Sequence, residues 1–196
     1  MHIIFQTPRL ILRQFTEADA PLILALNSDP QIVKYVHEPT LKSVEHAEEI
    51  ITNIILPQYK NNLGRWAIHT KDTNDFIGWC GLKYRPGLDE IDLGYRLMQK
   101  AWGKGYAKEA AQHSLNFGFY NLNLKLITGR AHVENIASIK VLEKIGMDFI
   151  SEGIVDDCPV RTYTKSNPNS CNLCNSANSC LKNVKARNIS ANYFVI

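Results

Sequence analysis

Apolar and polar side chains alternate along several short stretches of this chain, and a period of two is typical of half-buried strands. Clusters of polar, turn-forming residues separate these stretches, as at 71–75 and at Pro86-Gly87. The two stretches that flank 71–75 are therefore expected to form a hairpin. The pattern predicts seven strands, over residues 9–15, 64–70, 76–84, 90–98, 125–132, 148–155 and 160–165.

Apolar residues at helical spacing fill most of the intervals between these strands. Thr16 is placed to cap the first helix, with Asp19 as the acidic partner three residues on. Ser43 and Asn135 are suited to cap two later helices. The spacing predicts helices over 16–27, 43–59, 105–121 and 136–145, and a short helical turn at 31–36.

The order of these elements is that of a mixed α/β domain, with strands and helices interleaved along the chain. We expect this domain to span residues 1–166. Composition changes abruptly after residue 166: asparagine, serine and cysteine dominate 167–196, and no acidic residue occurs there. We expect this tail to be mostly irregular.

Bulk composition excludes several classes of protein. A chain of 196 residues with 45% hydrophobic content can bury a core, whereas a net charge of +3 is too small to indicate a nucleic-acid partner. No apolar run reaches the roughly 18 residues of a membrane span, and the N-terminus lacks a signal-type pattern. A cytoplasmic protein that binds neither membrane nor nucleic acid is the expectation, as monomer or homodimer. The spacing of Cys171, Cys174 and Cys180 lacks a fourth ligand, so no metal site is predicted.

A loop over residues 99–107 is the strongest candidate for a binding site. It follows the strand at 90–98, contains Gly103 and Gly105, and leads into the helix that begins at 105. A strand, a tight glycine loop and a helix N-terminus bring together backbone N–H groups and the positive end of the helix dipole. Lys104 and Lys108 add positive charge. The arrangement predicts an anion site of the phosphate-binding kind.

Three motifs in order resemble the GCN5-related N-acetyltransferase (GNAT) family. The first is the loop itself, Lys100-Ala101-Trp102-Gly103-Lys104-Gly105, which is similar to the family signature [Q/R]-x-x-G-x-[G/A] except that lysine occupies its first position. The second runs from Asn135 to Met147 and the third from Thr7 to Arg13, and both are similar to the branch of ribosomal-protein N-terminal acetyltransferases. This resemblance implies a mostly antiparallel six- to seven-stranded sheet with helices on both faces.

The resemblance also implies acetyl-coenzyme A as the co-substrate, with no metal. Backbone groups at the end of the strand at 90–98 would hold the pantetheine arm, and N–H groups from Trp102 to Lys108 would hold the phosphates. Asn135 would bond the pantetheine amide in addition to capping its helix. The implied coenzyme-binding residues are Leu97, Met98, Gln99, Lys100, Trp102, Gly103, Lys104, Gly105, Tyr106, Ala107, Lys108 and Asn135.

The chemistry requires a neutral amine to attack the thioester and a proton for the leaving thiolate. The resemblance implies Asp92 as base, directly or through water, and Ser138 as the group that reaches the coenzyme sulfur. Relatives use a tyrosine at the position of Leu142 as acid and a glutamate at the position of Arg130 as base, and neither is matched. Glu90, His132 and Glu134 are further candidate bases.

The leading interpretation is transfer of an acetyl group from acetyl-coenzyme A to a primary amine, most like protein N-terminal acetylation. An α-amine, with a pKa near 7.7 to 8.0, needs little help to lose its proton at neutral pH. Two alternatives stay open: a small-molecule amine such as an antibiotic, polyamine or amino acid derivative, and a coenzyme-binding module with little catalysis. A cationic acceptor would favour an acidic cleft, for which the candidates are Glu38, Glu45, Glu48, Glu49, Asp89 and Glu90.

Overall fold

The computed structural model describes residues 2–36 and 38–169. The predicted irregular tail, including its three cysteines, lies outside the described residues from position 170 onward. Packed structure extends at least to Asn167, whose buried side-chain amide donates to the carbonyls of Phe119 and Leu124 at 3.2 and 3.0 Å. No helix within the described ranges is both long and apolar enough to cross a membrane.

One sheet forms the centre of the molecule, and its strands lie in the order β1-β2-β3-β4-β5-β6-β8-β7. Neighbouring strands are antiparallel except β5 and β6, which are parallel. The strands are β1 Ile3–Gln6, β2 Leu10–Gln14, β3 Gly64–Thr70, β4 Phe76–Arg85, β5 Glu90–Leu97, β6 Leu126–His132, β7 Asp148–Val155 and β8 Cys158–Ser166.

All seven predicted strands are present, and the mixed α/β class with a mostly antiparallel sheet is confirmed. The predicted number of strands was one too low, because β1 was missed. This strand pairs only with β2, through Phe5 and Leu12 among others, and both of its ends are exposed. A four-residue edge strand with that burial has no alternation long enough to be recognised.

The predicted helices are also present, although the one expected over 43–59 is not uniform. Ser43 caps it as predicted, its hydroxyl accepting from the N–H of His46 at 3.2 Å. The helical run then passes through a π-helical and a 3-10 segment, the latter containing Pro57, which lacks an N–H group. The helical segments are η1 Glu17–Asp19, α1 Ala20–Asn27, α2 Pro30–Val33, α3 Val44–Ile50, η2 Ile51–Ile55, η3 Leu56–Asn61, η4 Gln99–Ala101, α4 Tyr106–Tyr120 and α5 Ile136–Lys144.

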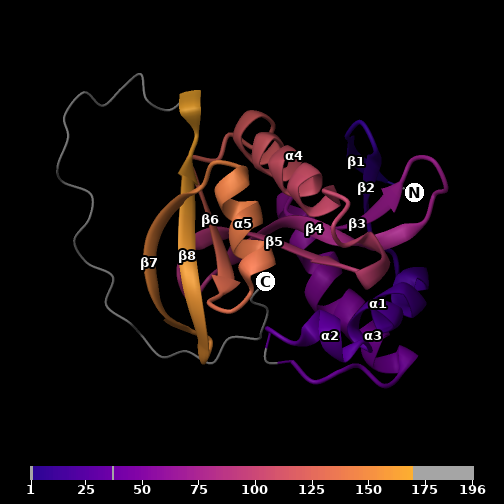
Figure 1. Ribbon diagram of the computed structural model, residues 1–196. Helices are drawn as coiled ribbons and strands as arrows, with labels where there is room; N and C mark the ends of the chain where they lie inside the picture. Colours follow the sequence, from indigo (N-terminus) through magenta and orange to yellow (C-terminus); the bar gives the residue numbers. More distant parts are fainter. Residues whose placement is uncertain (1, 37, 170–196) are drawn as a thin grey trace, which may run out of the picture.

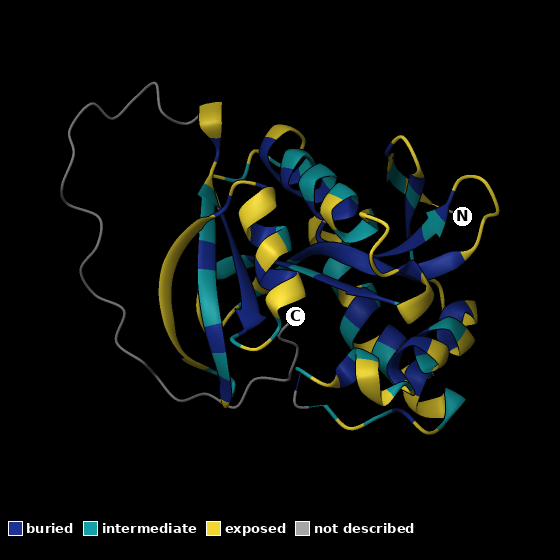
Figure 2. Ribbon diagram, viewed as in Figure 1, coloured by how far each residue is buried: buried dark blue, intermediate teal, exposed yellow. Residues whose placement is uncertain are grey.

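Helices cover both faces of the sheet, as expected (Figure 1). Alternate residues of β3 show this division: Trp66 and Ile68 belong to the core shared with α4 and α5, whereas Ala67 belongs to the core shared with α1 and α3. Figure 2 shows the central strands buried and β7, at one edge, exposed along its length. The side chains of β5 that face α4 and α5 are thereby separated from those that face the other side.

Candidate active site

The parallel strands β5 and β6 diverge soon after they meet. Only two register pairs join them, Asp92 with Thr128 and Leu93 with Gly129. Beyond these pairs β5 continues to Leu97 and β6 to His132, so the facing edges of the two strands separate toward their carboxyl ends. Each strand leads into a helix, β5 into α4 and β6 into α5, so the N-termini of both helices lie near this opening.

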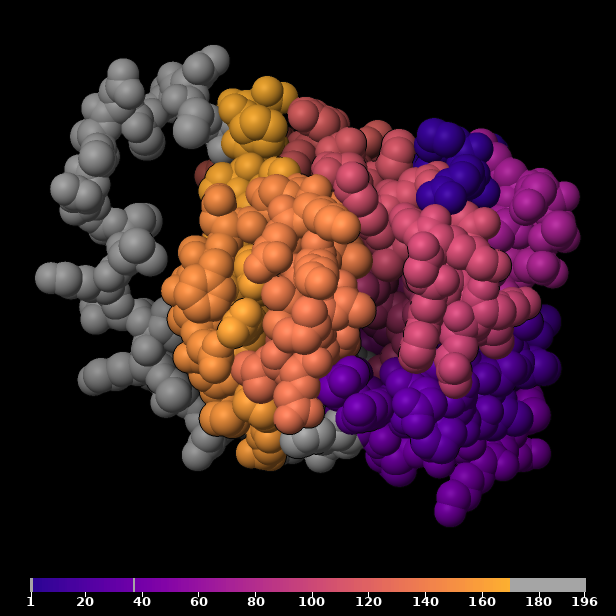
Figure 3. All heavy atoms as spheres, in the orientation of Figure 1, coloured from indigo at the N-terminus to yellow at the C-terminus, as the bar shows by residue number. Residues whose placement is uncertain are grey.

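A cavity of about 630 Å³ occupies this region. Its walls come from the end of β5, the starts of α4 and α5, and the segment around α2. In Figure 3 the orange surface of α5 and the pink surface of α4 face each other above the indigo N-terminal helices. Nine residues predicted for the site line the cavity: Leu97, Trp102, Gly103, Gly105, Tyr106, Ala107, Lys108, Asn135 and Ser138. Five others do not: Asp92, Met98, Gln99, Lys100 and Lys104.

The N-terminus of α4 has no side-chain cap. Its N-cap is Gly105, in the left-handed conformation with φ +79°, and Gly103 has φ +73°. Side chains are strained at such angles, which accounts for glycine at both positions. The first intrahelical bond runs from the N–H of Glu109 to the carbonyl of Gly105. The three N–H groups of the first turn before it can therefore bind an anion in the cavity.

The N-terminus of α5 is capped by Asn135, as the sequence predicts. Its side-chain oxygen accepts from the N–H of Ser138 at 3.1 Å, and within the described residues its amide nitrogen makes no hydrogen bond. One asparagine can thus cap the helix through oxygen and donate to a ligand through nitrogen. The buried Tyr95 hydroxyl donates to the Ser138 carbonyl at 3.2 Å, which ties α5 to β5.

The backbone of β5 offers Leu97 rather than Met98 to the opening. The Met98 N–H donates to the Ile77 carbonyl on β4 at 2.9 Å, so it points toward β4. Because N–H groups alternate in direction along a strand, that of Leu97 points to the β6 side. The Leu97 carbonyl accepts from the Trp102 indole N–H at 2.8 Å, which holds the glycine loop (residues 99–105) against the strand.

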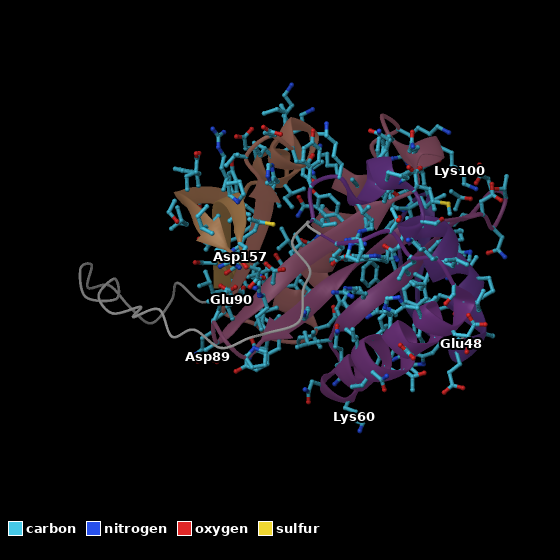
Figure 4. All side chains as sticks on the ribbon, turned by 90° about the horizontal axis from the view of Figure 1, so that it is seen from below. Glu48, Lys60, Asp89, Glu90, Lys100 and Asp157 are labelled. Atoms are coloured by element: carbon cyan, nitrogen blue, oxygen red, sulfur yellow. The ribbon has the colours of Figure 1, made fainter. Side chains whose placement is uncertain are left out.

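The side chains of Gln99 and Lys100 point away from the cavity. Gln99 donates to Asp29 at 2.6 Å, and Lys100 is exposed. Figure 4 shows Lys100, in η4 after the end of β5, and Glu90, at the start of β5, on opposite sides of the molecule. In this structure Gln99 and Lys100 could therefore contact a ligand in the cavity only through their backbone groups.

Asp92 lies at the base of the opening, on the sheet face away from α4 and α5. It is buried, and its carboxylate is 3.4 Å from Arg130, which also forms a two-pronged ion pair with Glu90. Burial raises the pKa of Asp92 to about 6, although Arg130 and Arg85 act to lower it. A carboxyl group that titrates near neutral pH is suited to exchange protons.

His132 is placed less favourably for proton abstraction. Its Nδ1 accepts from the Glu134 N–H at 3.2 Å, so in the neutral ring the proton resides on Nε2. Its ring lies against Tyr35, with centroids 5.4 Å apart. This geometry disfavours His132 as the base. Of the other candidates, Glu134 lines the cavity, and Asp92 lies beneath it without lining it.

The sequence reasoning missed the wall of the cavity that α2 and its following residues provide. Tyr35, Val36 and the strand residue Arg96 line it. Arg96 donates to Asn27 and, at 3.1 Å, to Glu38, both far away in sequence. The contacts between β5 and the α2 segment join residues that are far apart in sequence, so no local pattern in the sequence indicates them.

Comparison with known proteins identifies the family. Residues 9–148 match the Acetyltransferase (GNAT) domain family. An uncharacterized N-acetyltransferase p20 of Bacillus licheniformis is 34% identical over 155 residues, which cover 77% of this chain and 84% of that protein. The chain therefore belongs to the GNAT family of acetyltransferases, which use acetyl-coenzyme A, and the predicted resemblance is confirmed.

Solved structures with this fold include enzymes for different acceptors. A ribosomal-protein alpha-N acetyltransferase (RimL) bound to coenzyme A aligns with TM-score 0.73 and 15% identity, over 84% of this chain and 98% of that chain. A spermidine N-acetyltransferase from Vibrio cholerae, bound to coenzyme A and spermine, aligns with TM-score 0.69 and 21% identity, over 81% and 95%. At these identities the similarity establishes the fold alone.

If the glycine loop binds phosphates, a negative charge at Gly103 should oppose binding. A side chain added there meets no atom within 4 Å, so Gly103→Asp and Gly103→Ala share the same backbone strain and differ mainly in charge. We expect Gly103→Asp to bind coenzyme A at least about tenfold more weakly than Gly103→Ala, measured by isothermal titration calorimetry. Equal affinities of the two variants would contradict the assignment of the phosphate site.

Proposed function

We propose that this N-acetyltransferase acts on the α-amine at the N-terminus of a protein or peptide, with coenzyme A in the cavity described above. The observation that carries the coenzyme site in this proposal is the convergence of two helix N-termini on the opening between β5 and β6. Phosphates at the first turn of α4 and the thioester near α5 would place the donor along the edge of β5. The acceptor then reaches the thioester from the other face of the sheet.

On the donor side, the proposed contacts use groups that the fold leaves accessible. N–H groups from Gly103 to Lys108 would bind the diphosphate, with Lys108 adding charge, whereas the Trp102 N–H already donates to the Gln99 carbonyl at 3.0 Å. The Leu97 N–H would bond the pantetheine arm or the thioester oxygen, where it would stabilise the developing oxyanion. The amide nitrogen of Asn135 would donate to the pantetheine.

On the acceptor side, the arrangement of acidic residues favours an α-amine over a polyamine. Three of the acidic candidates are already engaged or distant: Glu38 is paired with Arg96, Glu90 with Arg130, and Glu45 is exposed on α3. Glu48 and Glu49 on α3 are exposed as well. A polyamine would need carboxylates that are not matched by arginines, whereas an α-amine needs only a site for one proton.

One observation favours the second candidate, a small-molecule amine. Among the residues that the structure describes, the buried Oε1 atom of Glu38 has no hydrogen-bond partner, while Oε2 accepts both bonds from Arg96. An ammonium group on the acceptor would satisfy this oxygen. A small-molecule amine would therefore be bound through Glu38, whereas an α-amine would depend mainly on Asp92 as the proton acceptor.

The proposed chemistry is a direct transfer. The neutral amine nitrogen attacks the thioester carbon, the carbon–sulfur bond breaks, and coenzyme A leaves as a thiolate. Ser138, at the first turn of α5, would donate a proton to that thiolate and be re-protonated from solvent. Asp92 would take the proton lost by the amine through an intervening water, since its side chain does not line the cavity.

The acceptor is tested by initial rates with acetyl-coenzyme A and matched amines at pH 7. Because a lysine pKa lies about 2.5 units above that of an α-amine, far more of the α-amine is neutral. We expect kcat/KM for a peptide with a free N-terminus to exceed that for spermidine, and for the same peptide blocked at its N-terminus, by at least about tenfold. Faster turnover of spermidine would favour the second candidate, and coenzyme binding without turnover of any amine would indicate a non-catalytic module.

Removing the Ser138 hydroxyl tests its role as proton donor. Ser138→Ala should lower kcat by at least about tenfold while the dissociation constant of coenzyme A changes little, because the hydroxyl acts on the leaving group. Ser114→Ala, which removes a buried serine from the middle of α4, is the matched control. Comparable kcat values for the Ser138 variant and the wild type would assign thiolate protonation to another group or to solvent.

The pH profile tests Asp92. Its carboxylate accepts a proton only when ionised, so kcat/KM should rise with pH through about 6, the pKa of Asp92. In Asp92→Asn this limb should vanish, leaving the limb set by the acceptor amine near pH 8 and a lower rate. Glu90→Gln, which alters the other partner of Arg130, should keep the limb near 6. A limb that persists in Asp92→Asn would exclude Asp92 as the base.

A further inference from the structure

The N-terminal motif at residues 7–13 meets the first turn of α4, about a hundred positions away in sequence. Glu109 accepts three hydrogen bonds from it: from the Thr7 hydroxyl at 2.6 Å, the Arg9 N–H at 2.9 Å and Arg9 Nε at 2.6 Å. These contacts lie just before β2, which begins at Leu10, and the Arg9 carbonyl accepts from the Lys71 N–H at 2.9 Å. They join the start of the domain to the helix that begins at the glycine loop.

Arg9 also contacts the glycine loop directly. Its Nη1 donates to the Lys104 carbonyl at 3.0 Å, and its guanidinium lies 4.6 Å from the centre of the Tyr106 ring. Described peptide bonds are all trans, so the N–H of Gly105 points opposite to the Lys104 carbonyl, away from Arg9. Holding that carbonyl therefore fixes the direction of an N–H group whose residue lines the cavity.

We propose that Arg9 is a positioning residue for coenzyme binding: it holds the glycine loop in the conformation that presents backbone N–H groups to the coenzyme diphosphate. This inference rests on the proposed coenzyme site. Arg9 itself does not line the cavity, so it acts through the Lys104 carbonyl and through Glu109. Its planar guanidinium reaches both acceptors at once, which a lysine ammonium cannot do.

Arg9 also has an electrostatic effect on the proposed phosphate site, through Glu109. Glu109 is an acid in the first turn of α4, the region proposed to bind phosphates. Although burial alone would raise its pKa, the bonds from Thr7 and Arg9 lower it, so the carboxylate is ionised. Arg9 pairs with that carboxylate at 2.6 Å and so offsets its charge. Loss of Arg9 would release the loop and also leave an unpaired carboxylate beside the diphosphate.

The test compares Arg9→Gln with wild type by calorimetric titration of coenzyme A and by steady-state kinetics. The Arg9 side chain is 48% exposed, so the variant should fold. We expect the dissociation constant of coenzyme A and the KM for acetyl-coenzyme A to rise about tenfold, with kcat at saturation and the KM for the acceptor within about twofold of wild type. Arg9→Lys should recover little of the lost affinity.

Arg161→Gln is the matched control, since Arg161 forms a comparably exposed ion pair with Glu152 across β7 and β8. It should leave coenzyme affinity unchanged. Unchanged affinity in Arg9→Gln, or a fall in kcat without a loss of coenzyme affinity, would overturn the role of Arg9 alone. Failure of the wild type to bind coenzyme A would overturn the proposed site and this inference with it. If Arg9→Gln does not fold, Arg9→Lys, which keeps the charge, is tested in the same way.

Discussion

The rest of the site depends on one constraint, the short parallel pairing of β5 with β6. Parallel neighbours need a crossover, and here the crossover is α4, so the carboxyl ends of both strands lie at the same edge and each leads into a helix. Ligands of open α/β sheets bind outside such carboxyl ends. Because pairing stops at Leu93 and Gly129, the edge of β5 beyond this point is available to a ligand.

An opened sheet leaves backbone groups without partners, and the structure limits that cost. The Trp102 indole satisfies the Leu97 carbonyl, and Met98 remains bonded to β4. At the closed end of the opening, Arg130 on β6 is bonded to Glu90 and Asp92 on β5, so charged pairs join the two strands where their backbones are still close. The opening is therefore bounded at one end by an ionic contact and at the other by two helix N-termini.

Local features of the sequence predicted several structural elements around the cavity. Gly103 and Gly105 require left-handed backbone angles, and Asn135 is a helix cap, so each signals its structure through its immediate neighbours. The seven longer strands carried their alternation in the sequence, whereas β1 was too short and too exposed to do so. Met98 shows the limit of such reasoning: its position was recognisable, but the direction of its N–H depended on the pairing with Ile77.

The charged groups on the other face of the sheet were less predictable, because they are brought together by contacts between distant segments. Glu38 was a candidate acid for an acidic cleft, but in the structure it forms an ion pair with Arg96 of β5. The raised pKa of Asp92 was equally unpredictable, because it results from burial in a sheet whose strand order could not be deduced from the sequence. The proposed donor site thus depends on short motifs, and the proposed acceptor site depends on pairings across the sheet.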